Sequence, residues 1–424
     1  MSDHPAGGAR LGEQTRTVDQ HVDGVLAAMT PLHPYDQPLL EALSLPVCET
    51  ISAPMELPSF DNSGMDGYAV CCDDVASATD EQPVHLPVVG EVAAGQTTLF
   101  AMSPGTTVTI MTGAPVPQGA DAVVPVEWTD GGAASVQITR APTLGQHIRR
   151  RGEDVRTGDI LLEEGTLLGP RQLGLLASVG RDQVRSRPRP RLVIMSTGSE
   201  LREPGTTLGH DSVYDANSYM LAAAARDAGA IAYRVGIVSD DPAEFSDALS
   251  DQLVRADLVV TSGGVSRGQY DVVKEALSKL GTVDFGDVAM QPGKPQGFGV
   301  VGEDETPIFT LPGNPVSSYV SFEVFVVPAI RRMMGRLPYR RPLDQAVVSQ
   351  GFSSAPGKRQ FVRALFEIDS EIDREGAQVT PIGGHGSHLI GDLAEANALI
   401  VVPEDTRSVE SGSQVQVLRL DRDF

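Results

Sequence analysis

Four short apolar runs alternate with polar segments in the middle of the chain. They cover residues 192–195, 232–238, 258–260 and 308–310. Short runs rich in β-branched residues are typical of strands that are buried on both faces of a parallel sheet. Helical spacing of apolar residues follows several of these runs, as in SYMLAAAARDAG. The pattern predicts a doubly wound parallel α/β domain over residues 190–336.

Small and polar residues follow each of these strands directly. The segments are STGSE, SDDP, TSGGVS and LPGNP. Such residues let the backbone turn sharply and point N–H groups outward, and open α/β sheets receive anionic ligands at the carboxyl ends of their strands. We therefore expect one ligand crevice at this edge of the sheet, for a ligand that carries phosphate. The chain has no Walker motif and no GxGxxG fingerprint, so a standard nucleotide fold is not indicated.

The patterns on either side of the α/β domain differ from it. Helical spacing in residues 17–45, interrupted by Pro31 and Pro34, predicts two short helices, and a further helix is expected over 171–179. Short β-rich runs separated by Gly and Pro turns predict small β domains. The predicted parts are a disordered tail (1–16), an N-terminal helical domain (17–50 with 151–183), an inserted β domain (51–150), the central α/β domain (190–336) and a C-terminal β domain (340–424).

Composition narrows the function classes. The 424 residues carry a net charge of −23 with a sequence pI near 4.7, which argues against a nucleic-acid-binding protein or one held to an anionic membrane. No apolar run approaches membrane-spanning length, and the N-terminal segment lacks a signal-peptide core. Three cysteines, two of them adjacent, suggest neither a disulfide framework nor a zinc site. A cytoplasmic setting fits these features best.

Acidic residues gather near the predicted turns. Carboxylates can serve as oxygen ligands of Mg²⁺ or as hydrogen-bond acceptors for a heterocycle. Each one alone is more simply explained as a turn or capping residue, and Asp271 could cap the helix after the third strand or hold a metal. Which of Asp240 and Asp241 faces a ligand stays open. The absence of a GxSxG elbow favours catalysis by positioning, metal ions and electrostatics over a covalent intermediate.

Together the motifs resemble the molybdopterin molybdenumtransferases and the related cofactor-making domain of gephyrin. The matching segments follow the family order from about residue 17 to 420 and are SFDNSGMDGYAV, IMTGAPVPQGADAVV, IRRRGEDV, STGSEL, VYDANS, SDDP, TSGGVSRGQYD, QPGKP, LPGNPVSS and GSH. The resemblance implies an elongated homodimer whose cleft combines the α/β domain of one subunit with β domains of the other. The 17–50 and 151–183 domain would then serve dimerisation.

The reaction that the resemblance implies inserts molybdenum from molybdate into adenylylated molybdopterin, with Mg²⁺-dependent release of AMP. The molybdopterin adenylyltransferase and molybdoenzymes would be further partners. The catalytic residues that it implies are Asp66, Thr112, Asp154, Glu200, Asp240, Asp271, Pro312 and Pro315. Asp240 and Asp271 would also hold the metal. The substrate-binding residues that it implies are Ser262, Gly263, Gly264, Ser266, Asn314, Lys294, Arg363 and Ser387, of which Lys294, Arg363 and Ser387 look like the molybdate-holding set.

One position departs from the family pattern. Many relatives carry Lys-Pro-Gly-Lys-Pro where this chain has Gln291-Pro292-Gly293-Lys294-Pro295. A neutral amide replaces a cation, so we expect molybdate to bind more weakly or to depend more on Arg363.

Two other functions compete with this one. The preceding enzyme, molybdopterin adenylyltransferase, resembles the central domain but needs little beyond it, whereas this chain has flanking helical and β parts. A non-catalytic pterin-binding scaffold is the alternative from another class, and the presence of Asp240, Asp271 and Lys294 speaks against it.

Overall fold

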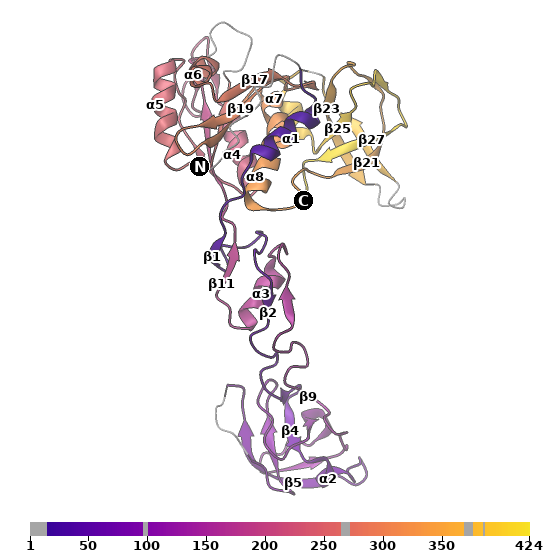
Figure 1. The fold of residues 1–424 in the computed structure, drawn as a ribbon. Coiled ribbons are helices and arrows are strands. Elements are labelled where there is room, and N and C mark those ends of the chain that lie inside the picture. The colour runs from indigo at the N-terminus through magenta and orange to yellow at the C-terminus, as the bar shows by residue number, and fades with distance from the viewer. Residues whose placement is uncertain (1–14, 96–100, 264–271, 369–375, 385) are drawn as a thin grey trace, which may run out of the picture. The chain divides into compact units, whose positions relative to one another are not determined.

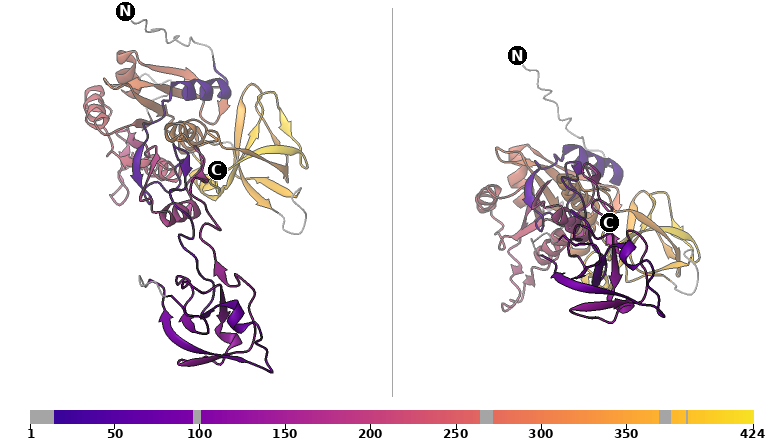
Figure 2. Two further views of the ribbon diagram at one scale, coloured as in Figure 1. Left: turned by 60° about the horizontal axis from the view of Figure 1, so that its bottom comes forward. Right: turned by 90° about the horizontal axis from the view of Figure 1, so that it is seen from below.

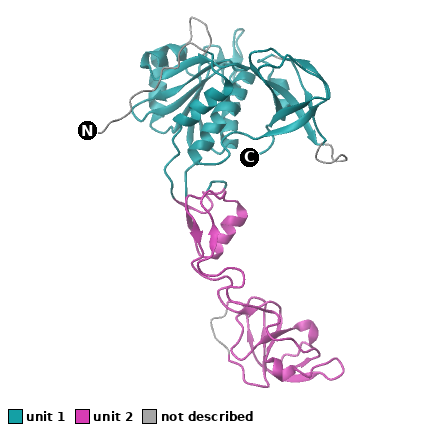
Figure 3. Ribbon diagram, turned by 45° about the vertical axis from the view of Figure 1, so that its right-hand side comes forward, with its two compact units in different colours: residues 1–35, 44–46, 186–424 teal, residues 36–43, 47–185 magenta. Residues whose placement is uncertain are grey.

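The computed structural model describes residues 15–95, 101–263, 272–368, 376–384 and 386–424. The chain divides into two compact units (Figure 3). The first unit contains residues up to 35, 44–46 and 186–424, and the second contains residues 36–43 and 47–185. The predicted division into a tail and four domains is finer than this and stays a prediction.

A six-stranded sheet forms the centre of the first unit. Its strand order is β15-β12-β16-β20-β19-β17. The four predicted strands are all present and run parallel to one another, although the second ends at Arg234 and not at residue 238. They are β15 (Ile231–Arg234), β12 (Arg191–Ser196), β16 (Leu258–Ser262) and β20 (Thr306–Leu311).

The far edge of this sheet is antiparallel, which the sequence did not predict. β19 (Pro295–Val301) pairs antiparallel with β20, and β17 (Val283–Asp287) pairs antiparallel with β19. Gly297 and Gly299 interrupt the apolar pattern of β19. A Cβ at Gly297 would lie 1.9 Å from the Thr310 hydroxyl, and one at Gly299 would lie 2.2 Å from the Thr282 carbonyl oxygen. Only glycine fits at these positions, so the strand lacks the usual hydrophobic signature.

Helices cover both faces of the sheet (Figure 1). Alternate strand residues divide between two cores: Ile194 and Val260 pack in one cluster, and Val193 and Val259 pack in the other. The first cluster includes residues of α1, α4, α7, η2 and α8, and the second includes residues of α5 and α6. These helices are α1 (Val18–Ala28), α4 (Asn217–Asp227), α5 (Pro242–Leu253), α6 (Val272–Leu280), α7 (Pro315–Ser321), the π-helix η2 (Phe322–Val326) and α8 (Val327–Met334).

Two helix predictions need correction. The helix expected over 316–333 changes to a π-helix at η2, just before Pro328, which has no N–H to donate to the preceding turn. The second N-terminal helix is absent: residues 39–44 form turns in which Leu40 is 83% exposed. An exposed leucine gains no packing energy, so helical spacing alone does not stabilise a helix there.

The C-terminal part of the first unit is a closed β structure, seen in yellow in Figures 1 and 2. Strand β23 pairs with both β24 and β25, and this double pairing closes the ring β23-β24-β21-β27-β25. The predicted β architecture is therefore confirmed. The strands are β18 (Met290–Gln291), β21 (Leu343–Val348), β23 (Arg359–Ile368), β24 (Ala377–Pro381), β25 (Ala398–Val402) and β27 (Gln414–Arg419). Short strands β22 (Phe352–Ser353) and β26 (Ser408–Val409) pair beside them, and α9 is Ile390–Glu395.

The second unit contains a five-stranded sheet in the order β7-β4-β6-β5-β8, which confirms the expected β content. These strands are β4 (Gly67–Val70), β5 (Val84–Val92), β6 (Thr107–Ile110), β7 (Ala122–Pro125) and β8 (Ser135–Ile138). A separate core around Leu168, Leu173 and Leu176 includes α3 (Pro170–Ser178), close to the helix predicted over 171–179. The short pairs are β2 (Ile51–Ser52) with β10 (Ile160–Leu162) and β3 (Asn62–Ser63) with β9 (Ile148–Arg149).

Candidate functional site

The carboxyl ends of three parallel strands are joined through one side chain, Asn217. Its Nδ2 donates to the Ser262 hydroxyl at 2.7 Å and to the Gly313 carbonyl at 2.6 Å. Ser262 ends β16, and Gly313 follows β20. Asn217 itself begins α4, which follows β12 along the chain. One amide therefore fixes the mutual positions of the loops that should receive a ligand.

Asp215 stabilises this arrangement as a buried hydrogen-bond acceptor. It is 1% exposed and accepts hydrogen bonds from the Ser196 hydroxyl (3.1 Å), the Ser218 backbone N–H (3.0 Å) and the Ser218 hydroxyl (2.6 Å). It thus ties the end of β12 to the first turn of α4, where a carboxylate is favourable.

Gly263 lies where the turn after β16 requires glycine. Its φ is +96°, and an added Cβ would lie 3.1 Å from the Thr197 carbonyl oxygen. Its N–H donates to the Leu311 carbonyl at 3.1 Å, which ties this turn to the end of β20. A predicted binding residue therefore has a backbone reason to be glycine.

The structure distinguishes the two carboxylates after β15. Asp241 caps α5: its Oδ1 accepts from the N–H groups of Ala243 and Glu244 at 2.8 and 3.0 Å. Asp240 is exposed, and its Oδ2 accepts from the Ser199 N–H at 2.7 Å and the Ser199 hydroxyl at 2.5 Å. Asp241 therefore has a structural role, while Asp240 reaches the loop after β12; that Asp240 is the ligand-facing carboxylate stays a prediction.

The donor set around Asp240 suits a magnesium ion. Glu200 is exposed on the same loop as Ser199, so two carboxylates and hydroxyl oxygens belong to this region. Hard oxygen ligands of this kind are what Mg²⁺ prefers. No group of three His, Cys, Asp or Glu side chains with metal-binding geometry occurs among the described residues. The second proposed ligand, Asp271, lies outside them, as do Gly264 and Ser266.

The loop after β20 contacts the C-terminal part of the first unit. Asn314 Nδ2 donates to the Ser387 hydroxyl at 2.9 Å, and the Val316 N–H donates to the Ser387 carbonyl at 3.1 Å. Pro315 is the first residue of α7, where a missing N–H costs nothing, and Pro312 is buried before it. The structure therefore brings together Asn314, Pro315 and Ser387, which the sequence had assigned to one site.

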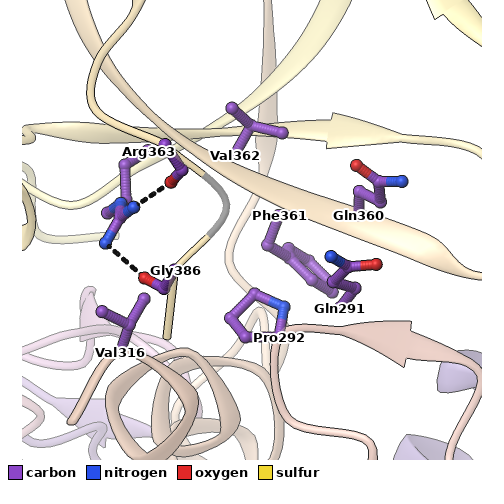
Figure 4. A pocket seen from close by; sticks show the side chains of 9 residues that line it. Gln291, Pro292, Val316, Gln360, Phe361, Val362, Arg363 and Gly386 are labelled. Carbon is purple, nitrogen blue, oxygen red and sulfur yellow. Dashed lines mark hydrogen bonds between the residues drawn. The ribbon is translucent and has the colours of Figure 1, made fainter. Parts of the chain in front are cut away.

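A small pocket of about 20 Å³, open to solvent, lies beside this contact (Figure 4). Arg363, on β23, lines it and is 4% exposed. Its guanidinium donates to the carbonyls of Leu389 (2.9 Å), Gly386 (3.3 Å) and Gly384, and lies 3.7 Å from Asp392. Burial lowers the pKa of Arg363 from its ordinary value, and Asp392 opposes that shift. Arg363 thus holds the loop that carries Ser387 at one wall of the pocket.

Lys294 does not line this pocket. Its Nζ pairs with Asp287 Oδ2 at 2.9 Å, and its side chain is half-buried. The two cations expected to hold an oxyanion are therefore both engaged by protein groups, and the polar lining of the pocket includes the amides of Gln291 and Gln360.

The second unit brings together Asp66 and Thr112. Asp66 Oδ1 accepts from the Thr112 N–H at 2.6 Å and from its hydroxyl at 2.8 Å, and both residues are exposed. These two hydrogen bonds, the backbone one first, lower the pKa of Asp66. The pair presents an ionised, oriented carboxylate.

Asp154 is exposed in the turn after the arginine run, and its N–H donates to the Leu57 carbonyl at 3.0 Å. In the same turn, Arg150 pairs with Asp61 at 2.7 Å, and the Arg151 N–H donates to Asp61 at 2.8 Å. These contacts, the backbone one first, lower the pKa of Asp61. The charged turn thus binds the segment before Asp66.

Sequence reasoning missed the roles of Asn217, Ser199 and Gln360. Asn217 lies in the quoted segment VYDANS, but its partners Ser262 and Gly313 are distant in sequence, so no local pattern indicates these contacts. No sequence signal distinguishes Gln360 from any other polar strand residue.

Models of known protein families match three segments that together cover most of the chain. Residues 16–180 match the model of the MoeA N-terminal region (domain I and II), residues 193–332 match a probable molybdopterin binding domain, and residues 345–420 match the MoeA C-terminal region (domain IV). The fold and the site are thus those of a multidomain protein with a central domain of molybdopterin-binding type.

The chain belongs to the MoeA family of molybdopterin molybdenumtransferases, which are transferase enzymes. It is 46% identical to molybdopterin molybdenumtransferase 2 of Mycobacterium tuberculosis, over 95% of this chain and 99% of that protein. It is 36% identical to the molybdopterin molybdenumtransferase of Haemophilus influenzae, over 89% of this chain and 92% of that protein.

Solved structures agree with the family. Two crystal structures of molybdopterin biosynthesis MoeA proteins from Pyrococcus horikoshii have TM-scores of 0.78 and 0.72 to this chain, with 29% and 26% identity. They cover 97% and 95% of this chain and 100% and 99% of their own chains. None of the described residues form a helix long and apolar enough to cross a membrane.

Proposed function

We propose that this chain transfers molybdenum from molybdate to adenylylated molybdopterin and releases AMP in a Mg²⁺-dependent step. The main support for the proposal is the structure at the edge of the parallel sheet, where Asn217 fixes the loops of Ser262 and Gly313. The chain that contains this edge belongs to the molybdopterin molybdenumtransferase family. Backbone N–H groups and small side chains at such an edge suit the phosphates of a pterin nucleotide.

Within this proposal, Asp240 holds the nucleotide end of the site together with Asp271. Ser199 orients the Asp240 carboxylate through its N–H and hydroxyl, so the free carboxylate oxygen has a defined direction. Bound Mg²⁺ would supply neutralisation of phosphate charge as AMP leaves. Glu200, on the same exposed loop, adds a further oxygen donor near the phosphates.

The oxyanion end of the proposed site is the pocket beside Arg363. Burial strengthens the field of a cation, because little water screens it. Ser387 and Asn314, hydrogen-bonded to each other, lie on the loops next to this pocket and would adjust to the incoming molybdate. Lys294 would release Asp287 to join them.

Asp66, Thr112 and Asp154, in the second unit, complete the proposal through a homodimer. We infer that they act on the substrate held by the α/β domain of the partner copy, with the oriented Asp66 carboxylate facing the pterin. A cytoplasmic location, where adenylyltransferase and molybdoenzymes would meet this enzyme, belongs to the same proposal. The Thr112 hydrogen bonds to Asp66 support it, because they hold an exposed carboxylate in one orientation.

The test supplies purified adenylylated molybdopterin with and without molybdate and measures AMP. The proposal expects AMP release that requires both molybdate and Mg²⁺, and pterin that then contains molybdenum. AMP release that does not depend on molybdate, or tight pterin binding without turnover, would contradict the proposed reaction.

A further inference from the structure

Arg234, the last residue of β15, joins two loops at the carboxyl edge of the sheet. Its Nε donates to the Ser218 hydroxyl at 2.8 Å, and one terminal nitrogen donates to both carboxylate oxygens of Glu203, at 2.9 and 3.1 Å. The guanidinium also stacks on the Tyr219 ring, 3.6 Å from its centroid, and the Tyr219 hydroxyl donates to Glu203 at 3.1 Å. Three side chains therefore hold this guanidinium in one place and one orientation.

One arm of this contact runs inward to the buried Asp215. The Ser218 hydroxyl has a single proton, and because it accepts from Arg234 Nε it donates that proton to Asp215 Oδ2, at 2.6 Å. Asp215 also accepts from the Ser196 hydroxyl at the end of β12. Asn217, the amide that joins two further loops, lies in the same turn of α4. The inward arm therefore sets the position of this turn relative to β15 and β12.

The outward arm holds the loop after β12. Glu203 directly follows β13 (Leu201–Arg202), and this short strand directly follows Ser199 and Glu200. Ser199 orients the Asp240 carboxylate through its N–H and its hydroxyl. Because Glu203 is only three residues from Glu200, a fixed Glu203 carboxylate limits how far both of these site residues can move. The outward arm therefore reaches the proposed nucleotide and metal end of the site.

We propose that Arg234 is a positioning residue of the reaction, which fixes the nucleotide and metal end of the site by holding two loops to β15. It acts through Glu203 on the loop after β12 and through Ser218 on the first turn of α4. Arginine suits this task because its planar fork donates in two directions at once, whereas lysine offers a single compact charge. This inference rests on the proposed function, because it assumes that the phosphates and Mg²⁺ bind at this edge.

A contribution of Arg234 to stability alone would have different consequences. Ion pairs that are partly open to water contribute little to the free energy of unfolding, and the Glu203 side chain is 39% exposed. A displacement of about 1 Å at a reacting centre, by contrast, can lower a rate about 100-fold. Loss of Arg234 should therefore affect the reaction much more than it affects the fold.

The experiment measures AMP release from adenylylated molybdopterin by the full chain, with Mg²⁺ and molybdate varied separately. Arg234→Gln should lower kcat at least about tenfold and raise the Mg²⁺ concentration for half-maximal rate about tenfold. The molybdate concentration for half-maximal rate should change by less than about twofold, because the proposed oxyanion end lies at Arg363, on β23.

The outcomes separate this inference from the proposed function. An unchanged kcat and Mg²⁺ requirement in Arg234→Gln, or equal changes in the Mg²⁺ and molybdate requirements, overturns the inference and leaves the proposed function intact. Absence of the reaction in the unchanged protein contradicts both.

Arg191→Gln is the matched control for the loss of an arginine ion pair. Arg191 pairs with Asp257 at 2.8 Å at the amino end of β12, in the same sheet. Urea unfolding should show a similar, small loss of stability in Arg191→Gln and Arg234→Gln, while kcat and the Mg²⁺ requirement change only in Arg234→Gln. A similar fall of kcat in both variants would assign the effect to general stability and refute the positioning role.

Two further variants test the fork geometry. Arg234→Lys keeps the charge but not the two-way donation, so it should recover only part of kcat; full recovery would show that charge alone matters and would contradict the proposal. Glu203→Ala removes only the outward arm and keeps the proposal testable if Arg234→Gln does not fold. It should also raise the Mg²⁺ requirement, and the double variant should be no worse than Arg234→Gln, because both residues belong to one network. Fully additive losses would argue against that shared role.

Discussion

Replacement of Asn217 tests the geometry of the sheet edge. Asn217→Ala removes two hydrogen bonds, of 2.7 Å to Ser262 and 2.6 Å to the Gly313 carbonyl. A neutral hydrogen bond contributes about 1 kcal/mol, so the first unit should lose about 2 kcal/mol of unfolding free energy. Displacement of the loops by about 1 Å should lower kcat about 100-fold. The activity loss should thus far exceed what a small change in the folded population explains.

The assays are urea unfolding followed by circular dichroism and molybdate-dependent AMP release. Asn217→Asp is the matched variant: it keeps the shape but places a carboxylate oxygen against the Gly313 carbonyl, so it should be at least as damaging as alanine. An Asn217→Ala protein with unchanged unfolding free energy and unchanged kcat would refute the role given to this amide.

Three further changes test separate parts of the structure. Asp66→Ala should lower kcat at least tenfold without changing stability, because the carboxylate is exposed and bonded only to Thr112 among the described residues. AMP release measures kcat, and thermal unfolding measures stability. An equal loss of kcat in a distant surface Asp→Ala variant would contradict a specific role for Asp66. Lys294→Ala should raise the molybdate concentration for half-maximal rate about tenfold, and an unchanged requirement removes Lys294 from the site. Burial, with the charge of Arg16 second, lowers the pKa of His21 from its ordinary value of 6.5 to about 4. The unfolded chain therefore binds the proton more readily than the folded chain. The contribution of His21 to the unfolding free energy should be full above about pH 6.5 and fall by about 3 kcal/mol as the pH drops to about 4. His21→Phe should reduce that fall in urea unfolding, and the same loss of stability in acid for both proteins would contradict this prediction.

The parallel core was predictable because its signal is local. Buried strands such as β12 and β16 consist of consecutive apolar residues that end in small polar ones, and this pattern reflects burial on both faces. The antiparallel edge was not predictable, because the glycines of β19 are required by contacts with Thr310 and Thr282 in neighbouring segments. Close approach between strands leaves no hydrophobic signature in the sequence.

The assignment of the site residues stays a prediction, but the structure shows which of their contacts a sequence can and cannot indicate. Asp66 bonds to Thr112, and Asn314 bonds to Ser387, so residues that the family resemblance named are in contact. The engagement of Arg363 by loop carbonyls was invisible, because main-chain partners carry no residue-type signal. That Asp241 and not Asp240 caps α5 also needed coordinates, since either carboxylate can cap a helix.

The most direct test of the account is AMP release from adenylylated molybdopterin by Asp240→Asn and Asp241→Asn proteins, with molybdate and Mg²⁺ varied. The account predicts that Asp240→Asn loses most of its rate and needs far more Mg²⁺. Asp241→Asn should keep its rate, because an asparagine still caps α5. Full activity of Asp240→Asn at ordinary Mg²⁺ would contradict the central claim that this strand edge is the nucleotide and metal end of the active site.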